Sequence, residues 1–283
     1  MKNTAKYIAI ATAIIAGGAI VSVVSAHAVS KSENIVDGIE IPEGFSRLVF
    51  YDDFSTPGAP DSTKWGWEEG YVRNGEMQYY TTGTNAWCED SMLIIEARAD
   101  SVVINGAVCP VTSASITTRG KAAWKYCYVE VRAKLPSFRG SWPAIWMMPE
   151  TSIYGDWPRS GEIDILEHVG YEPGNIHFAA HSERYNHMRS VQKNHICPAP
   201  DAVGQFHVYG LKRTPHSLTW YYDGEEKFTL KKEDGADWTS WPFDTEFNLI
   251  LNFAVGGGWG GMLGVDIDAL PQRYEIDYVR VFQ

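Results

Sequence analysis

Three acidic residues lie close together in the segment GEIDILEHVG at residues 161–170: Glu162, Asp164 and Glu167. Side chains of a β-strand point alternately to its two faces, so the first two share one face while Ile163 lies on the other. Glu167 would fall on the opposite face of a regular strand, because it is five positions after Glu162. One extra residue near Ile165 and Leu166, a β-bulge, restores the alternation. The spacing therefore predicts a bulged strand with all three carboxylates on one face.

Two neighbouring carboxyl groups on one strand face can hydrolyse a glycosidic bond. In retaining glycosidases the two groups are about 5 to 5.5 Å apart and act as nucleophile and general acid, whereas inverting enzymes leave a wider gap for water. The bulge brings Glu162 and Glu167 closer than a regular strand would, which favours the retaining geometry. The alternative is an acidic, solvent-facing strand without a catalytic role. Mutual repulsion and the depletion of Asp and Glu in strands weigh against it.

The composition points to a carbohydrate partner and away from nucleic acid. The chain has 283 residues and a formal net charge of −11, so its surface repels phosphate backbones. Its 11 Trp and 15 Tyr are a heavy aromatic load for one core, and flat rings offer apolar faces on which sugar rings stack. Most of these rings could also simply build a β-core. We therefore predict a polysaccharide substrate, no nucleic-acid partner and a monomer.

The first 28 residues have the pattern of a secretory signal peptide. Lys2 and Lys6 precede an apolar run over residues 7–24, which ends at an A-x-A cleavage site before Val29. The run is also long enough for an uncleaved membrane anchor, and the sequence leaves both readings open. No later segment is apolar enough to span a membrane. We therefore expect a secreted or periplasmic protein without stable membrane insertion.

Strand signals separated by turns run through the rest of the chain. Residues 29–46 are polar and unpatterned and are predicted to form a leader, and residues 47–283 are predicted to form one catalytic domain. In YCYVEVRAKL, residues 126–135, apolar and charged residues alternate, and no segment has a long helical period. Asp223-Gly224 is a hairpin-turn signal. About ten to fourteen strands without helices predict an all-β, antiparallel β-sandwich with a substrate cleft along one sheet face.

All the cysteines follow the signal segment: Cys88, Cys109, Cys127 and Cys197. An exported protein permits disulfides, and four cysteines allow three pairings, among which the sequence does not choose. Some of the four can also be free thiols in a domain with a large core. No C-x-x-C or His-rich spacing predicts a transition-metal site.

The sequence resembles glycoside hydrolase family 16, whose motif E-[I/L]-D-[I/F/V]-x-E corresponds here to residues 162–167. With its extra residue, the motif is similar to that of the laminarinase-type branch, since the motif of the lichenase branch lacks the bulge. The resemblance covers about residues 48–283 through these segments in order: YVRNGEMQYYT, WPAIWMMP, DWPRSG, FHVYGLKRTPHSLTWYYDG, LILNFAVGGGWGG and YEIDYVRVFQ. It implies a curved, concanavalin-like jelly roll and a secreted endo-β-1,3(4)-glucanase that needs no cofactor for catalysis.

The resemblance assigns a role to each carboxylate. Glu162 would be the nucleophile that attacks the anomeric carbon and forms a covalent glycosyl-enzyme. Glu167 would protonate the leaving oxygen and then act as base toward water. Asp164 would hydrogen-bond to the nucleophile and, as a neighbouring negative charge, help keep Glu167 protonated. His168 is expected on the other face, in a packing or hydrogen-bonding role.

The resemblance also implies five residues that bind sugar: Asn74, Trp142, Trp157, His181 and Trp259. Trp142 and Trp157 would flank the cleaved bond, and Trp259 would line the outer minus subsites. Asn74 would hydrogen-bond to a sugar hydroxyl, and His181 would contact the leaving-group side. Ordinary packing is the alternative for each of them.

Members of the family often carry a structural calcium ion far from the catalytic residues. Asp277 in YEIDYVRVF matches its side-chain ligand, and backbone carbonyls near Asp53 and Ser91 would complete the site. Oxygen ligands suit this ion. A solvated Asp in the last strand is the alternative.

Two loops depart from the common laminarinase pattern and leave the substrate open. HFAAHSERYNHMRS, residues 177–190, stands where many laminarinases have a Gly-rich loop, and GGGWGGMLG, residues 256–264, replaces a Pro-containing loop. Both are expected to line the groove, so the linkage could be β-1,3, mixed β-1,3/1,4 or, in the extreme, that of an agar- or carrageenan-type galactan. A non-catalytic lectin on the same fold is a further alternative. The sequence does not separate hydrolysis from transglycosylation.

Overall fold

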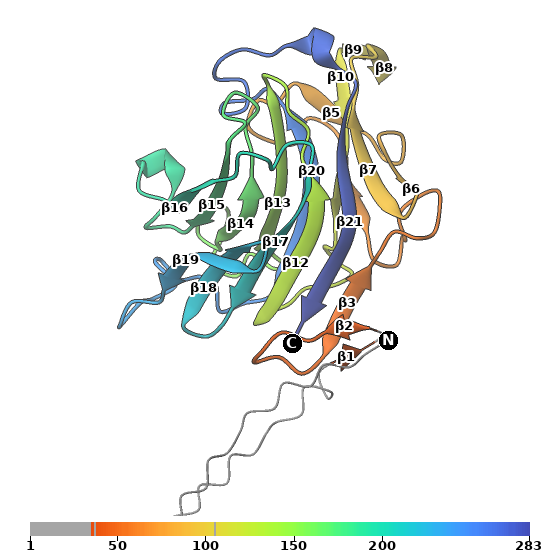
Figure 1. Cartoon of the computed structure of the whole chain (residues 1–283). Helices are drawn as coiled ribbons and strands as arrows, with labels where there is room; N and C mark the ends of the chain where they lie inside the picture. The colour runs from red at the N-terminus through yellow and green to blue at the C-terminus, as the bar shows by residue number, and fades with distance from the viewer. Residues whose placement is uncertain (1–34, 37, 105) are drawn as a thin grey trace, which may run out of the picture. The chain divides into compact units, whose positions relative to one another are not determined.

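The computed structural model describes residues 35–283 except 37 and 105, and the signal peptide predicted at residues 1–28 lies outside the described residues. Two antiparallel sheets stack on each other (Figure 1). The first contains, in spatial order, β16 (Lys193–Pro198), β15 (Asn175–His181), β14 (Glu162–Glu167), β13 (Ser141–Pro149), β20 (Phe247–Val255), β11 (Ser115–Thr117) and β4 (Gly66–Glu68).

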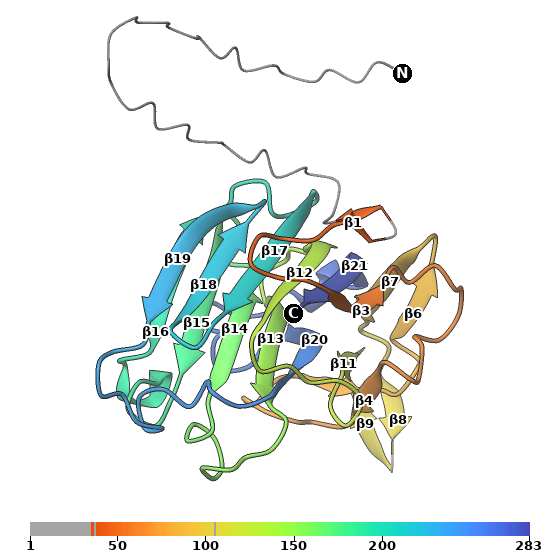
Figure 2. The ribbon, with the colours of Figure 1, turned by 90° about the horizontal axis from the view of Figure 1, so that it is seen from below.

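The second sheet contains β19 (Glu225–Lys231), β18 (Ser217–Tyr222), β17 (Phe206–Arg213), β12 (Cys127–Lys134), β21 (Gln272–Phe282), β7 (Met92–Ala97) and β6 (Ala86–Glu89), and β3 (Leu48–Asp52) also pairs with β21. Figure 2 shows the two layers from below. The remaining elements are short: β1 (Ile35–Val36), β2 (Ile39–Glu40), β5 (Gln78–Tyr80), β8 (Val102–Ile104), β9 (Ala107–Cys109), β10 (Val111–Ser113) and the 3₁₀ turns η2 (His187–Arg189) and η3 (Ile267–Ala269).

The hydrophobic core lies between the two sheets because apolar side chains alternate toward it. In β12, Val129 and Val131 are buried while Glu130 keeps part of its surface exposed. The central strand β20 is buried at every position. The indole N–H of Trp220 in β18 donates to the backbone oxygen of Asp164 in β14 at 2.8 Å, which connects the two sheets. The predicted all-β, antiparallel sandwich is confirmed.

The predicted bulge is present in β14. Ile145 of β13 pairs with Leu166. The next β13 residue, Trp146, pairs with Asp164, so one residue of β14 is left out of the ladder. This residue is Ile165, which is buried in the core together with Leu166. The bulge therefore returns the last carboxylate of the strand to the outer face of the sheet.

The packed region begins earlier than the predicted domain start at residue 47. Within the predicted leader, residues 29–46, β1 and β2 pair as a small hairpin. Ile39 and Ile41 are buried against Tyr128 and Phe282 of the second sheet. Ile39 and Ile41 alternate with Glu40 over only three residues, which is too short a pattern to indicate a strand, so the sequence alone did not predict this contact.

The predicted hairpin turn between β18 and β19 is also confirmed. Asp223 and Gly224 have φ angles of +51° and +77°, the positive values that a tight turn of this kind requires. All four cysteines are buried free thiols. Among the described residues, no helix has the length and apolarity needed to cross a membrane.

Candidate active site

β14 places its three acidic residues on the face of the first sheet that points away from the core. The Glu162 side chain is 17% exposed and the Asp164 side chain 3%. Gly161, just before them, has a φ of +90°, and a Cβ there would lie 2.8 Å from Pro242 Cγ and 3.1 Å from Phe243 Cε1. Glycine alone meets both conditions without strain. This residue therefore fixes the point at which the chain enters β14.

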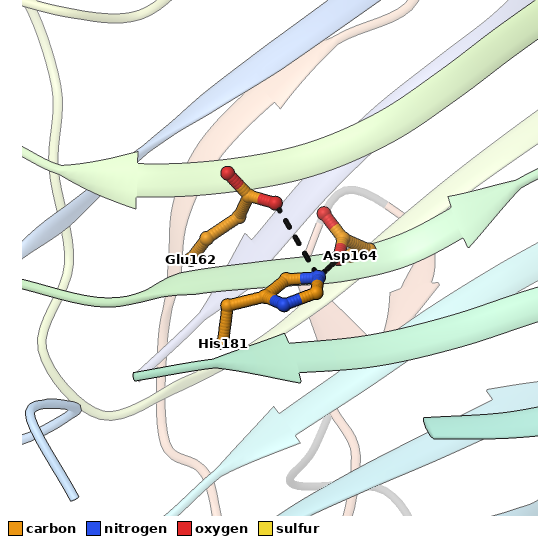
Figure 3. A group of neighbouring side chains, drawn as sticks. All are labelled: Glu162, Asp164 and His181. Carbon is orange, nitrogen blue, oxygen red and sulfur yellow. Dashed lines mark ion pairs between the residues drawn. The ribbon is translucent and has the colours of Figure 1, made fainter. Parts of the chain in front are cut away.

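β15 brings a histidine to the carboxylates. His181 lies opposite Glu162 in the β14–β15 ladder. Its Nε2 is 3.6 Å from Glu162 Oε1 and 3.3 Å from Asp164 Oδ2 (Figure 3). Its Nδ1 is buried and has no hydrogen-bond partner in the described part of the chain. His181 thus contacts two of the three carboxylates directly.

Burial raises the pKa of all three carboxyl groups. The pKa of Glu167 rises to about 8, first because of burial and then because of repulsion by Asp164. The pKa of Asp164 rises to about 8 through burial, and that of Glu162 rises to about 8 through burial and the charge of Asp164. Since three like charges in a buried cluster repel one another, the cluster holds protons near neutral pH.

The surroundings of Glu162 and Glu167 differ in charge. His181 and the guanidinium of Arg73 both lower the pKa of Glu162. Around Glu167, Asp164 and Glu76 raise the pKa, while the Trp142 indole N–H and His181 lower it. Around Glu162, Asp164 and Glu167 raise the pKa, so each carboxyl group has both repelling carboxylates and stabilising groups beside it, and the Arg73 guanidinium acts on Glu162.

An aromatic corner forms beside Glu167. The indole N–H of Trp142 donates to Glu167 Oε1 at 3.0 Å. The Trp142 ring packs edge-on against the Trp259 ring, with centroids 5.6 Å apart. The Trp259 ring also packs against the imidazole of His177 in β15, with centroids 4.8 Å apart. Asn74 lies at the same corner, because its backbone oxygen accepts a hydrogen bond from the loop that carries Trp259. The structure thus brings three of the predicted sugar-binding residues together.

A second aromatic group lies beside Glu162. The Trp157 ring centroid is 6.0 Å from that of His181 and 4.9 Å from that of His187. The Trp157 indole N–H is buried without a hydrogen-bond partner among the described residues. Trp142 and Trp157 therefore lie beside different carboxylates. His187, which the sequence did not single out, comes from the loop that departs from the laminarinase pattern.

Sequence reasoning missed two polar residues beside the carboxylates. Arg73 forms an ion pair with Glu68, and its guanidinium carbon lies 4.8 Å from the Trp146 ring centroid. Glu76 is buried and accepts a hydrogen bond from Tyr80 Oη at 3.1 Å. The alternation of polar residues at positions 76, 78 and 80 was a signal for one strand face, but no such signal exists for Arg73 in its loop.

His168 is separate from this site. It is buried, and burial lowers its pKa to about 4. Neither ring nitrogen has a side-chain hydrogen-bond partner among residues 38–283 as described. A neutral, enclosed imidazole agrees with the predicted packing role.

The sequence matches the family described as glycosyl hydrolases family 16 over residues 72–280. The chain belongs to glycosyl hydrolase family 16. The predicted family resemblance and the glycoside hydrolase class are thereby confirmed. The acidic motif, the bulge and the aromatic residues described above all lie inside the matched region.

Several relatives within family 16 are similar over most of this chain. The β-glucanase of Rhodothermus marinus is 44% identical over 247 residues, which cover 84% of this chain and 85% of that protein. The crystal structure of the laminarinase from the same organism superimposes with a TM-score of 0.80 over 84% of this chain and 97% of that one. SCLam, a non-specific endo-β-1,3(4)-glucanase, has 41% identity and a TM-score of 0.80, over 87% of this chain and 93% of its own.

A relative with a different stated substrate is also similar. The keratan-sulfate endo-1,4-β-galactosidase of Sphingobacterium multivorum is 34% identical over 242 residues. The match covers 84% of this chain and 55% of that protein.

Asp277, the predicted calcium ligand, lies where β21 changes neighbours. Val279 pairs with Asp52 of β3, and Ile276 pairs with Leu93 of β7, so Asp277 falls at the junction of the two strands. The backbone near Asp53 and Ser91 borders this junction, and oxygen donors of this kind fit calcium. The Asp277 carboxylate, however, is ion-paired with Arg132. The guanidinium therefore competes with a metal ion for the single side-chain ligand.

Proposed function

We propose that this family 16 glycoside hydrolase cleaves β-1,3-glucan and mixed β-1,3/1,4-glucan within the polymer and retains the anomeric configuration. The geometry of the site carries the proposal: the bulge at Ile165 returns Glu167 to the sheet face that holds Glu162 and Asp164, and the Trp142 indole N–H donates to Glu167. One ionised and one protonated carboxyl group are what a double displacement needs. The stated activities of the Rhodothermus marinus protein and of SCLam support the choice of glucan.

The reaction proceeds in two steps. Glu167 gives its proton to the glycosidic oxygen, the bond from that oxygen to the anomeric carbon breaks, and the Glu162 carboxylate bonds to the carbon to form a glycosyl-enzyme. Glu167, now ionised, takes a proton from water, whose oxygen attacks the same carbon and releases Glu162. Proton and carboxylate charges return to their starting positions.

The neighbouring residues prepare this cycle. Asp164 is buried and close to both other carboxyl groups, and repulsion between Asp164 and Glu167 raises the pKa of Glu167. Trp142 holds Glu167 through its indole N–H. We assign Trp142, Trp157 and Trp259 to sugar binding because their rings lie beside the carboxylates, and Asn74 because it lies at the same corner, where its amide donates to Glu76 at 3.1 Å.

Replacement of the nucleophile tests the proposal. Glu162→Gln removes the attacking carboxylate at nearly constant volume, so laminarin and barley-glucan hydrolysis should fall by about 10³-fold or more while the melting transition is kept. Glu226→Gln, an exposed carboxylate of β19, is the matched control and should retain activity. Proton NMR of the first products from the parent protein should show the β-anomer. Undiminished turnover by Glu162→Gln, or an initial α-anomer, would contradict the mechanism.

Two alternatives are separated by the same assay panel. The similarity to a keratan-sulfate galactosidase makes galactans necessary controls, so agarose, carrageenan and keratan sulfate are assayed beside the glucans. Turnover of galactans alone would overturn the glucan assignment. A lectin would bind glucan without turnover, and an intact, proton-sharing carboxylate cluster argues against it. Products longer than the substrate would reveal transglycosylation.

We further propose that the chain is exported as a monomer and that calcium binds weakly at Asp277. The apolar segment with its A-x-A site supports export. Mass spectrometry of the exported protein should give a chain that begins at Val29. For calcium, the ion would stabilise the junction of β3, β7 and β21, and Arg132 limits its affinity.

A further inference from the structure

A histidine nitrogen and two carboxylate oxygens converge on one point at the site. These atoms, from Glu162, Asp164 and His181, all lie within 4.8 Å of one another, as Figure 3 shows. Ring nitrogen and carboxylate oxygen are both common zinc ligands. We propose that these three side chains bind a zinc ion, and that the ion inhibits the enzyme by occupying its nucleophile.

The spacing of the donor atoms matches a tetrahedral ion. Zinc bonds to nitrogen and oxygen of about 2.0 to 2.1 Å place neighbouring ligand atoms about 3.3 Å apart. His181 Nε2 is 3.3 Å from Asp164 Oδ2 and 3.6 Å from Glu162 Oε1. Both distances from the imidazole nitrogen to the carboxylate oxygens therefore already approach the edge length of such a tetrahedron. The third distance, between the two carboxylate oxygens, is within 4.8 Å, and rotation of the Glu162 side chain would shorten it.

The burial of the donors favours a cation at this point. Asp164 is 2% exposed, and its Oδ2 accepts no hydrogen bond among the described residues, although His181 Nε2 lies 3.3 Å away. A buried carboxylate oxygen that accepts no hydrogen bond is costly, and a second carboxylate of the same sign lies nearby. A divalent ion would neutralise both charges and satisfy this oxygen. The fourth position of the ion would face outward and hold water.

The site should bind zinc moderately and not as a structural centre. Metal-binding histidines usually donate their second N–H to an acceptor, but His181 Nδ1 has none among the described residues. Strong thiolate ligands are absent from the site, because the four cysteines are buried elsewhere in the core. A missing acceptor of this kind typically lowers metal affinity about 10- to 100-fold. Removal of zinc by a chelator should therefore be rapid.

Inhibition follows from the proposed role of Glu162. With Glu162 Oε1 bound to zinc, the carboxylate cannot attack an anomeric carbon, and the ion fills the space beside the sugar. Zinc and glucan would exclude each other. The binding itself rests only on the donor geometry, whereas the inhibition also rests on the proposed function.

Calorimetric titration of the intact protein with zinc chloride tests the binding. One saturable site is expected, and His181→Gln or Glu162→Gln should weaken it about tenfold or more. His207→Gln is the matched control: His207 also contacts two carboxylates, but through opposite ring nitrogens, at 2.7 Å from Asp223 and 3.7 Å from Asp201, so they cannot share one ion with it. Its zinc affinity should equal that of the parent. Melting curves establish that each variant is folded.

Laminarin assays test the consequence. Zinc should raise the apparent KM without changing kcat, and a chelator should restore activity. In the calorimeter, a saturating glucan oligosaccharide should abolish zinc binding to the parent protein. No saturable binding, or equal binding by the parent and by both site variants, overturns the proposal. A different outcome separates the two proposals. If His181→Gln loses zinc binding but the parent turns over no glucan, the proposed function is overturned and the proposed metal site is retained.

Discussion

His181 Nε2 lies 3.6 Å from Glu162 Oε1, across the ladder that joins β15 to β14. The same nitrogen is 3.3 Å from Asp164 Oδ2. The charge of His181 lowers the pKa of Glu162, the proposed nucleophile. In the proposed mechanism this contact should therefore influence the acidic limb of the pH profile.

Replacing His181 by Gln should move the acidic limb of kcat/KM to higher pH. That limb reports the ionisation of the nucleophile in the free enzyme. The charge of His181 lowers the pKa of Glu162, so the loss of His181 should raise that pKa. Activity on the acidic side of the new pKa should therefore fall, and activity near the optimum should fall much less.

The control for this shift is His177→Gln. His177 belongs to the same strand but contacts Glu172 at 3.4 Å, away from the nucleophile. Its loss should change KM through the neighbouring Trp259 while leaving the acidic limb in place. An unchanged limb in His181→Gln would show that the imidazole acts on substrate contacts alone.

Glu167→Gln should stabilise the fold, and the gain should grow with pH. In the folded state burial and Asp164 raise the pKa of Glu167 to about 8, above its ordinary value. Between these two values the folded state binds more protons than the unfolded state, so the parent loses stability as pH rises through that window. The variant has no such proton to lose. Thermal melts from pH 5 to pH 8 should show a growing advantage of at least about 1 kcal/mol.

Glu226→Gln serves again as the control, since this exposed carboxylate should give a difference that does not vary with pH. A Glu167→Gln advantage that shrinks toward pH 8 would mean that the carboxyl group is not held protonated in the folded protein.

Local sequence patterns predicted the carboxylate strand, but they did not predict contacts between segments that are distant in the sequence. The phase error at Glu167 was visible within six residues and correctly predicted the bulge at Ile165. The approach of His181 to Glu162 depends on the register of two strands, which the flanking sequences do not encode in an obvious way. Arg73 was missed because a loop residue has no periodicity to interpret.

The same distinction explains the position of the domain start. Residues 29–46 mix polar residues with Gly and Pro and have no long hydrophobic period, so a leader was the natural prediction. Ile39 and Ile41 nevertheless find a complementary apolar surface on Tyr128 and Phe282, which are distant in sequence. The short run that contains Ile39 and Ile41 leaves no pattern that a composition argument could detect.

Calcium should stabilise the protein through Asp277, and a chelator should reverse the effect. An ion that binds only the folded state adds about 2.7 kcal/mol at a concentration 100-fold above its Kd. The melting temperature should rise with calcium in the parent but not in Asp277→Asn. Because Arg132 competes for the carboxylate, Arg132→Gln should lower the calcium concentration needed. Equal responses of the parent and Asp277→Asn would remove calcium from this site.

Gly161→Ala should reduce both stability and turnover, because two separate constraints act at this residue. The φ of +90° disfavours any side chain, and the new Cβ would lie 2.8 Å from Pro242 Cγ and 3.1 Å from Phe243 Cε1. A loss of about 1 to 3 kcal/mol in the free energy of unfolding is expected. The adjacent Glu162 should shift with the backbone, and kcat should fall by about 10²-fold for a displacement near 1 Å.

Gly58→Ala separates the two constraints. Gly58 has a φ of +109°, but a Cβ there meets nothing within 4 Å, so this variant carries the backbone strain without the collision. Its loss of stability should be the smaller of the two, and its kcat should match that of the parent. The difference between the variants then measures how tightly Pro242 and Phe243 fix the start of β14. Equal kcat values for Gly161→Ala and the parent would show that the nucleophile tolerates movement of the residue before it.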